Sequence, residues 1–300
     1  MYVLVGANGY LGSYVMRAIL RQTHEQIIAT ARKIDDLHDS NRVSWRQCDI
    51  QREEDVARLT EELREQSDVK IVYLAAYHHP DQVAQNPEYA WNVNVTCLSR
   101  FVNSVRFAKT LFYASTDSVY GNSVDGYRFR EDDSLHPVNV YGHNKCAAEA
   151  VVVHAGFHVA RFPFLISPSI CQKKHFYDVI AESIRAGIPF EMFSDSYRSS
   201  LSFENAAGLL VSVMELEGNV PDILNICGDA ALSKYDVGLM VADQCGVDRK
   251  LIVPVSIGKK QENFETERAV SVLMDNSRVK QLLHLSAIDI FDEPQAEVSI

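Results

Sequence analysis

The chain has 300 residues and a mass of 33.7 kDa, enough for one large domain or two closely packed domains with a sizeable core. Hydrophobic residues make up 47% and charged residues 23%, which excludes a disordered, collagen-like or coiled-coil chain. The formal net charge is −11, so the chain repels nucleic acid and anionic membranes, and we expect neither as a partner.

No segment predicts a membrane-bound, secreted or metal-binding protein. The longest apolar run covers about seven residues and ends at Tyr77, whereas a bilayer span needs roughly 20. The first ten residues lack the basic stretch and cleavage site of a signal peptide. The six cysteines lie 18 or more residues apart, without metal-ligand spacing. We therefore expect a cytoplasmic protein with reduced, mostly buried thiols and no metal.

The first half of the chain alternates short β-branched runs with longer amphipathic stretches. We predict strands at 2–5, 27–31, 43–48, 71–75, 110–115 and 158–162. We predict helices at 11–22, 53–66, 89–106 and 141–155. This alternation predicts an α/β fold with a doubly wound parallel sheet of the Rossmann type, covered on both faces.

The second half is less regular. We predict helices at 176–186, 203–215 and 235–245, separated by short strands at 189–192, 222–226 and 251–255. Residues 1–167 are thus expected to form a dinucleotide-binding domain. Residues 168–300 are expected to form mainly a smaller mixed α/β substrate lobe, with segments returning to the first domain. Ligands of doubly wound sheets bind at the carboxyl edge of the strands.

A glycine-rich loop follows the first predicted strand and opens the first helix. It runs Gly6-Ala7-Asn8-Gly9-Tyr10-Leu11-Gly12. Glycines at these positions permit a tight turn, backbone approach to a pyrophosphate and close packing of helix on strand. The N–H groups of the helix N-terminus then face the anion. A plain tight turn is the alternative, but the strand-loop-helix context favours dinucleotide binding.

The second predicted strand is followed by Arg32 and Lys33, where NAD-binding proteins carry an acidic residue for the ribose 2′-hydroxyl. A guanidinium at this position suits a 2′-phosphate, so we favour NADP(H) over NAD(H). Two solvated surface charges are the alternative. Two further groups of residues are expected at the cofactor: Asp49 and Ile50 at the adenine, and Leu74, Ala75 and Ala76 near the nicotinamide ribose.

A tyrosine and a lysine stand four residues apart at the start of a predicted helix, in Tyr141-Gly142-His143-Asn144-Lys145. Both side chains lie on one helix face, and an ammonium near a phenol favours the phenolate, so we expect a lowered tyrosine pKa. Such a tyrosine can exchange a proton with an alcohol. Thr116, in Ser115-Thr116-Asp117-Ser118-Val119-Tyr120-Gly121, ends the fifth strand and can hydrogen-bond a substrate oxygen.

In this order and spacing, these motifs resemble the extended short-chain dehydrogenase/reductases. Among them, the chain most resembles the dTDP-4-dehydrorhamnose reductase group, which reduces keto groups of nucleotide-activated deoxysugars. The resemblance covers nearly the whole chain. It implies an NADPH-dependent oxidoreductase acting on a keto group, with C4 as the expected position, and Tyr141 as proton donor. It also implies that Lys145 tunes Tyr141 and binds the nicotinamide ribose, that Thr116 completes the catalytic set, and that Asn94 supports the lysine. Phe164 is expected beside the cofactor.

The substrate implied by this resemblance is a nucleotide sugar, and four residues are expected to contact it: His78, Asp117, Ser118 and Arg198. For each, an ordinary loop, capping or surface role is the alternative. Ser118 replaces the second carboxylate of the related dehydratases, which argues against dehydration.

Other functions stay open. An epimerase or dehydratase of the same superfamily would retain its cofactor tightly. A reductase of a non-nucleotide carbonyl and a non-catalytic, cofactor-binding regulatory subunit are further alternatives, the last because a relative in this family binds a methionine adenosyltransferase. A homodimer through the helices that begin near Tyr89 and Tyr141 is possible. The sequence leaves open which nucleotide, sugar and stereochemistry are used.

Overall fold

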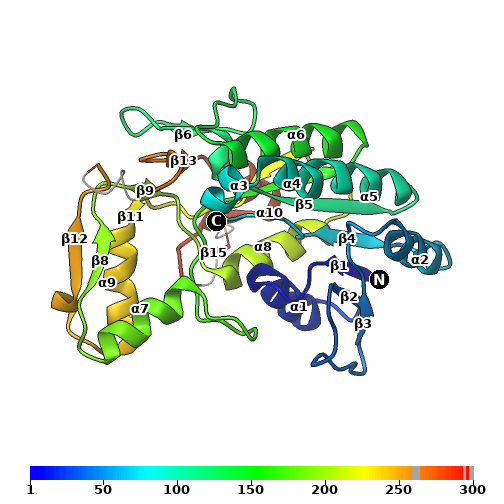
Figure 1. Ribbon diagram of the computed structural model, residues 1–300, viewed down its shortest axis with the longest axis horizontal. Coiled ribbons are helices and arrows are strands. Elements are labelled where there is room, and N and C mark those ends of the chain that lie inside the picture. Colours follow the sequence, from blue (N-terminus) through cyan, green and yellow to red (C-terminus); the bar gives the residue numbers. More distant parts are fainter. Residues whose placement is uncertain (259–263, 293–294, 297–300) are drawn as a thin grey trace.

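The computed structural model describes residues 1–258 and 264–292, and the backbone of 295–296. Seven parallel strands form its central sheet, in the order β10-β7-β5-β4-β1-β2-β3 (Figure 1). Their bounds are β1 (Tyr2–Val5), β2 (Ile27–Ala31), β3 (Val43–Gln47), β4 (Lys70–Tyr73), β5 (Thr110–Thr116), β7 (His158–Phe162) and β10 (Ile223–Asn225). The predicted doubly wound α/β fold is confirmed.

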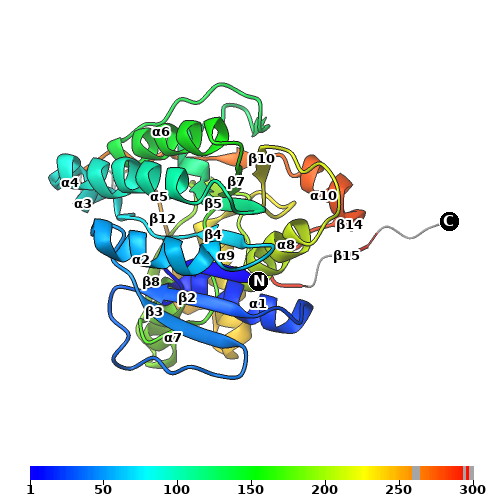
Figure 2. The same cartoon turned by 90° about the vertical axis from the view of Figure 1, so that its right-hand side faces the viewer.

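Helices cover both faces of this sheet (Figure 2). Alternate residues of β1 enter opposite layers: Tyr2 and Leu4 pack in one core, and Val3 and Val5 in the other. The first core includes residues of α1 (Tyr10–Gln22) and α8 (Phe203–Met214). The second includes residues of α2 (Glu53–Arg64), α5 (Leu98–Ser104) and α6 (Val140–His154). Strands buried on both faces explain the continuous apolar runs in the sequence.

A smaller lobe lies beside the sheet, at the left of Figure 1. It contains α7 (Phe176–Arg185), α9 (Lys234–Cys245) and the parallel strands β8 (Phe190–Phe193) and β12 (Ile252–Val255). Its own core includes Ile180 and Ile184 of α7 and Val237 and Val241 of α9. Both helices begin with capping boxes, and α9 ends at Gly246 in the left-handed conformation.

Two segments of the second half belong to the sheet domain. Sequence analysis expects segments of 168–300 to return to the first domain but groups the strand at 222–226 with the smaller lobe; β10 pairs in parallel with β7 at the edge of the large sheet. Helix α8 precedes it and packs in the same core as α1, since Ala206 and Leu210 are buried against that helix. The crossover through α8 returns the chain to the sheet, which a parallel edge strand requires.

The helix predicted at 89–106 is interrupted by one π-helical segment. It consists of α4 (Pro87–Trp91), a π-helix (Asn92–Cys97) and α5. Such bulges are rare and occur often at functional sites.

The remaining elements are short. They are the helices α3 (Pro80–Gln85) and α10 (Ser277–Leu283) and two 3-10 turns (Asp117–Val119, Arg249–Leu251). Short strands also pair: β6 (Arg128–Phe129) with β13 (Leu273–Met274), β9 (Tyr197–Arg198) with β11 (Leu232–Ser233), and β14 (Leu285–Ala287) with β15 (Gln295–Ala296).

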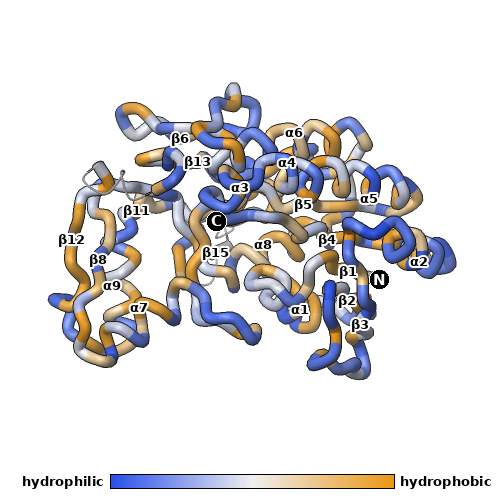
Figure 3. The backbone as a smooth tube through the Cα atoms, viewed as in Figure 1, coloured by the Kyte–Doolittle hydropathy of each residue, from blue (hydrophilic) through white to orange (hydrophobic). Residues whose placement is uncertain are grey.

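Hydropathy follows this architecture. The exposed helix α2 is largely hydrophilic, as its run of acidic residues predicts (Figure 3). Within the described residues, none of the helices combines the length and apolar character needed to cross a bilayer.

Candidate active site

The glycine loop connects β1 to α1 at the carboxyl edge of the sheet. Gly9 caps α1 without a side-chain hydrogen bond, so the first N–H groups of the helix remain available to a ligand. Gly6 has φ of +89°, and a Cβ on it would lie 3.1 Å from the Ala75 backbone nitrogen. A Cβ on Gly12 would lie 2.6 Å from the Ala7 carbonyl oxygen. Glycine at these two positions therefore lets the loop pack closely on α1 and on the segment after β4, as in dinucleotide-binding loops.

The predicted cofactor residues follow the same edge of the sheet. Arg32 and Lys33 come directly after β2 and are exposed. After β3, the Asp49 backbone nitrogen donates to Asp55, and Ile50 is buried. Among the described residues, neither Arg32 nor Lys33 forms a salt bridge, so both side chains can bind an anionic ligand.

Asn94 fixes the loop that follows β4. Its side-chain oxygen accepts from the Tyr77 backbone nitrogen at 2.8 Å, and its amide donates to the Tyr77 carbonyl at 2.9 Å. Asn94 is buried and lies within the π-helix. Asn94 thus positions the segment with Ala75, Ala76 and His78, whereas sequence analysis expects it to support Lys145. Desolvation, followed by the charge of Lys145, lowers the pKa of His78.

The end of β5 brings three predicted residues together. Thr116 Oγ1 lies 3.1 Å from Asp117 Oδ1 and 3.2 Å from Ser118 Oγ. The Ser118 backbone nitrogen donates to Thr116 Oγ1, which caps the short 3-10 turn. A Cβ on Gly142 would lie 2.6 Å from the Ser118 carbonyl oxygen, so a glycine here lets the start of α6 approach this turn. That approach brings the first turn of α6, which carries Tyr141, against the turn that follows Thr116.

Tyr141 lies on the first turn of α6, whose N-cap is the Asn139 side chain. Burial raises the pKa of Tyr141 and the charge of Asp117 raises it further, while a hydrogen bond from Thr116 lowers it. The expectation of a lowered tyrosine pKa is wrong for this structure. The physical reason is the burial of the phenol, to which the charge of Asp117 adds, while the Lys145 ammonium is held by Tyr113 and Ala114.

The Lys145 ammonium is held by a different tyrosine. It donates to the Tyr113 hydroxyl at 2.9 Å and to the Ala114 carbonyl at 2.7 Å. Burial lowers the pKa of Lys145 to about 7, against the opposing charge of Glu149. Lys145 is therefore a buried cation whose charge changes near neutrality.

A buried ion pair between Arg161 and Glu149 lies near this lysine. Arg161 binds the Glu149 carboxylate through Nε and Nη2, and the Ser115 hydroxyl also donates to that carboxylate. Arg161 and Glu149 are 2% and 3% exposed. The pair anchors α6 to β5 and β7, the strands whose ends carry Thr116 and Phe162.

The smaller lobe contributes a basic and aromatic pocket of about 420 Å³. Arg198 and Lys234 line it with Arg268 and the rings of Phe176, Phe193 and Phe264. Arg198 Nε lies 3.3 Å from Asp117 Oδ2, which links the pocket to the end of β5. The ring of Phe164 lies 5.0 Å from Lys234 Nζ and 6.1 Å from the Phe176 ring. Phe164 therefore lies where the sheet domain meets this pocket.

Sequence analysis misses Lys234, Arg268 and Tyr113. A Ser233–Asp236 capping box marks the start of α9, so it locates Lys234 on the first turn without showing that the turn faces the cleft. Burial, followed by repulsion from Arg198, lowers the pKa of Lys234 to about 8. Tyr113 lies within a buried strand and carries no sequence signal of its own.

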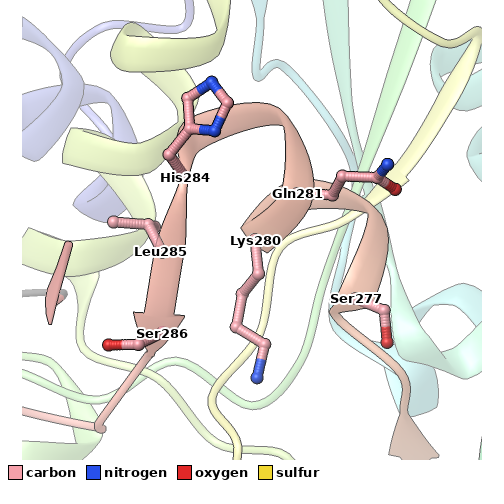
Figure 4. Close-up of a pocket in the computed structure, with 6 residues that line it drawn as sticks. All are labelled: Ser277, Lys280, Gln281, His284, Leu285 and Ser286. Atoms are coloured by element: carbon pink, nitrogen blue, oxygen red, sulfur yellow. The ribbon is translucent and has the colours of Figure 1, made fainter. Parts of the chain in front are cut away.

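A second hollow, of about 490 Å³, lies between α10 and β14 (Figure 4). Its lining comes from 277–286, and Lys280 there is paired with Asp229 at 3.0 Å. None of the strand ends that carry the predicted site contributes to it. The candidate functional site is the carboxyl edge of the sheet with the lobe pocket beside it.

This Rossmann sheet, with its glycine loop and its threonine, tyrosine and lysine, defines an extended short-chain dehydrogenase/reductase. The family model described as the RmlD substrate binding domain matches residues 1–290, so the chain belongs to that family. The family resemblance inferred from the motifs is confirmed.

Three curated relatives illustrate the range of functions. A probable low-salt glycan biosynthesis reductase, Agl14 of Haloferax volcanii, is 26% identical over 84% of this chain and 83% of its own length. The dTDP-4-dehydrorhamnose reductase of Mycolicibacterium smegmatis is 23% identical over 84% of this chain and 71% of its own. The methionine adenosyltransferase 2 subunit beta of Xenopus tropicalis is 24% identical over 62% of this chain and 57% of its own.

Solved structures share the fold. The Bacillus anthracis dTDP-4-dehydrorhamnose reductase in complex with NADP has a TM-score of 0.76 at 17% identity, over 96% of this chain and 94% of that one. The Bacillus cereus UDP-glucuronic acid 4-epimerase, in complex with UDP-glucuronic acid and NAD, has a TM-score of 0.79 at 17% identity, with the same coverage. The chain is thus an NAD(P)-dependent oxidoreductase of the extended short-chain type, related to nucleotide-sugar reductases.

Proposed function

We propose that the protein reduces a keto group, at C4, of a nucleotide-activated deoxysugar, with NADPH as the reductant. The observation that supports this proposal is the position of Thr116 at the end of β5, hydrogen-bonded to Asp117, whose carboxylate pairs with Arg198 of the basic lobe pocket. The nicotinamide cofactor supplies the hydride when bound. The chain itself binds, orients and protonates the substrate.

Each residue has a role that its surroundings support. Thr116 orients the keto oxygen toward Tyr141, which gives its proton to the forming alkoxide. A raised tyrosine pKa suits this direction, because the phenol stays protonated until the alkoxide forms. Lys145 binds the nicotinamide ribose and stabilises the resulting phenolate. The glycine loop, with Asn8, Tyr10 and Leu11, holds the pyrophosphate.

The substrate lies between two surfaces. His78, Asp117 and Ser118 contact the sugar from the sheet domain. Arg198, with Lys234, attracts the diphosphate of the nucleotide into the lobe pocket, whose aromatic rings suit a base. The chain as a whole is acidic, so the cationic side chains of the pocket, and not the net charge, attract the diphosphate.

The preference for NADPH rests on Arg32 and Lys33. Arg32→Ser should weaken NADPH binding while leaving NADH binding nearly unchanged, because only NADPH carries the 2′-phosphate. Titration of the purified protein with both cofactors measures this. Equal effects on NADPH and NADH would refute the assignment of Arg32.

The reaction is tested by oxidation of NADPH with dTDP-4-dehydrorhamnose and other 4-keto nucleotide sugars. Turnover should be lost in Tyr141→Phe, while NADPH binding is retained, because the substitution removes only the acidic hydroxyl. An active Tyr141→Phe variant would refute the role of Tyr141.

One second candidate has support of its own. The likeness to methionine adenosyltransferase 2 subunit beta favours a regulatory, cofactor-binding subunit. That candidate expects NADPH binding, no turnover on any keto sugar, and complex formation with a methionine adenosyltransferase. Cofactor retained through purification would instead favour an epimerase.

A further inference from the structure

Tyr113 is a buried tyrosine on β5, an inner strand of the sheet. This strand pairs in parallel with β4 and with β7, and Tyr113 lies opposite Tyr73 on the first and Val159 on the second. Tyr113 is 1% exposed and packs in the core layer that contains residues of α6. Because protein interiors are close-packed, a side chain held in this way has little freedom to move. Its hydroxyl is therefore a fixed point beside α6.

The ammonium of Lys145 binds at this fixed point. Lys145 Nζ donates to the Tyr113 hydroxyl at 2.9 Å and lies 4.3 Å from the centroid of the Tyr113 ring. It also donates to the Ala114 carbonyl at 2.7 Å. An ammonium has three N–H donors. Within the described residues, β5 accepts from two of them, so one is left for a ligand.

Two properties of Lys145 make this contact important. Lysine is a flexible side chain, so an ammonium without fixed partners samples many positions. Lys145 is also only 3% exposed, and a buried charge needs protein groups in place of the water it has lost. The Tyr113 oxygen supplies a hydrogen bond, and the Tyr113 ring supplies a cation–π contact.

Tyr113 acts through Lys145 and not on the substrate. Its hydroxyl is buried in the sheet layer, and Tyr113 is not among the residues that line the lobe pocket. Burial raises the pKa of Tyr113, so the side chain stays a neutral phenol whose oxygen accepts from the ammonium. Tyr141, by contrast, is partly accessible at the start of α6.

We propose that Tyr113 is a positioning residue that fixes the Lys145 ammonium for catalysis. This inference rests on the proposed function, in which Lys145 binds the nicotinamide ribose and stabilises the Tyr141 phenolate. Tyr113 itself bonds to neither of these groups. It sets the place of the ammonium together with the Ala114 carbonyl, so that the remaining N–H donor meets the ribose in a defined position.

Tyr73 offers a matched control on the neighbouring strand. It is completely buried, and its ring lies 6.1 Å from the Tyr113 ring. Its hydroxyl has no hydrogen-bond partner within the part of the chain that the structure describes. Tyr73→Phe and Tyr113→Phe therefore each remove one hydroxyl from the same core layer, but only Tyr113→Phe removes a partner of Lys145.

The first test observes the ammonium itself and needs no turnover. Protein with isotope-labelled lysine side chains is studied by NMR at roughly pH 6, where Lys145 is charged because its pKa is about 7, and Lys145→Arg assigns the Nζ signal. In the wild type and in Tyr73→Phe, the Lys145 protons should exchange slowly with water. In Tyr113→Phe they should exchange at least roughly tenfold faster, because a hydrogen bond of a charged group is lost.

Two results of the NMR test would overturn the proposal. One is a wild-type protein without a slowly exchanging Lys145 signal, since the ammonium would then not be held. The other is a Tyr113→Phe variant whose Lys145 signal keeps both its chemical shift and its exchange rate.

The second test measures oxidation of NADPH with 4-keto nucleotide sugars. Tyr113→Phe should lower kcat roughly tenfold and raise the Kd of NADPH, because Lys145 loses one of its two anchors. The KM of the sugar should stay unchanged, since the lobe pocket is not altered. Tyr73→Phe should match the wild type in all three constants. A Tyr113→Phe variant with a lower Tm but an unchanged kcat and NADPH Kd would show a structural role only and refute the proposal.

Failure of this inference and failure of the proposed function give different results. If the wild type turns over no keto sugar, the proposed function fails, and the NMR and NADPH-binding measurements still decide whether Tyr113 positions Lys145. If a keto sugar is reduced but Tyr113→Phe behaves like Tyr73→Phe in both tests, the proposed function stands and the role of Tyr113 is refuted.

Discussion

The buried pair of Arg161 and Glu149 offers a quantitative test of how the site is supported. Arg161 donates to the Glu149 carboxylate through Nε at 3.0 Å and Nη2 at 2.6 Å, and through Nη1 to the Tyr120 hydroxyl at 2.6 Å. Both charged groups are almost completely buried. Arg161→Met keeps much of the side-chain volume but removes the guanidinium, so that among the described residues the Ser115 hydroxyl is the side-chain donor left to the Glu149 carboxylate.

The expected cost follows from that uncompensated charge. Removing one partner of a buried ion pair costs about 3–5 kcal/mol. At roughly 2 °C per kcal/mol for a chain of this size, Tm should fall by roughly 6–10 °C. Replacing both partners, as Arg161→Met with Glu149→Leu, should recover most of the loss, because no charge then remains buried without a partner.

Thermal and urea unfolding of the single and double variants measure these values. Arg58→Met is the matched control: Arg58 pairs with Asp55 at 2.8 Å, but its side chain is 63% exposed, so its loss should cost about 0–1 kcal/mol. The reasoning is refuted if Arg161→Met costs no more than Arg58→Met, or if the double variant is as unstable as the single one.

Three further predictions concern the site and its surroundings. Gly142→Ala should lower the free energy of unfolding by about 1–3 kcal/mol and reduce turnover, because its Cβ would lie 2.6 Å from the Ser118 carbonyl oxygen. Urea unfolding and kcat measure these effects. Gly208→Ala is the control, since its Cβ would meet only the flexible Gln22 side chain. Burial lowers the Lys145 pKa to about 7, so its charge destabilises the folded protein fully below pH 7 and less as pH rises toward the unfolded pKa of 10.5. Lys145→Met should therefore raise the free energy of unfolding most below pH 7. A gain in stability that does not shrink between pH 7 and 10.5 would contradict this. Burial lowers the pKa of His175 from 6.5 to about 4, so stability that is present above pH 6.5 should be lost as pH falls toward 4. His175→Asn should reduce the dependence of the unfolding free energy on pH between 6.5 and 4. An unchanged dependence would show that other groups cause it.

Much of the fold follows from local patterns. The strand and helix positions in the first half agree with the structure to within a few residues, because β-branched runs and amphipathic stretches are short-range signals. The resemblance to the extended short-chain dehydrogenase/reductases rests on contiguous motifs and is confirmed by the family model. By contrast, the sequence did not show which segments of 168–300 return to the first domain, since a three-residue strand such as β10 carries no sign of the sheet it joins.

The sequence by itself determined the cofactor loop and the order of the chemical groups, because glycine spacing and a tyrosine four residues before a lysine are properties of adjacent residues. Only the tertiary structure decided their electrostatics. Tyr141 is surrounded by Thr116 and the charge of Asp117, while Lys145 is bound to Tyr113, so the tyrosine pKa is raised rather than lowered. The lobe pocket with Lys234 likewise joins segments far apart in the chain. Burial and through-space charge depend on three-dimensional packing, and no local pattern records them.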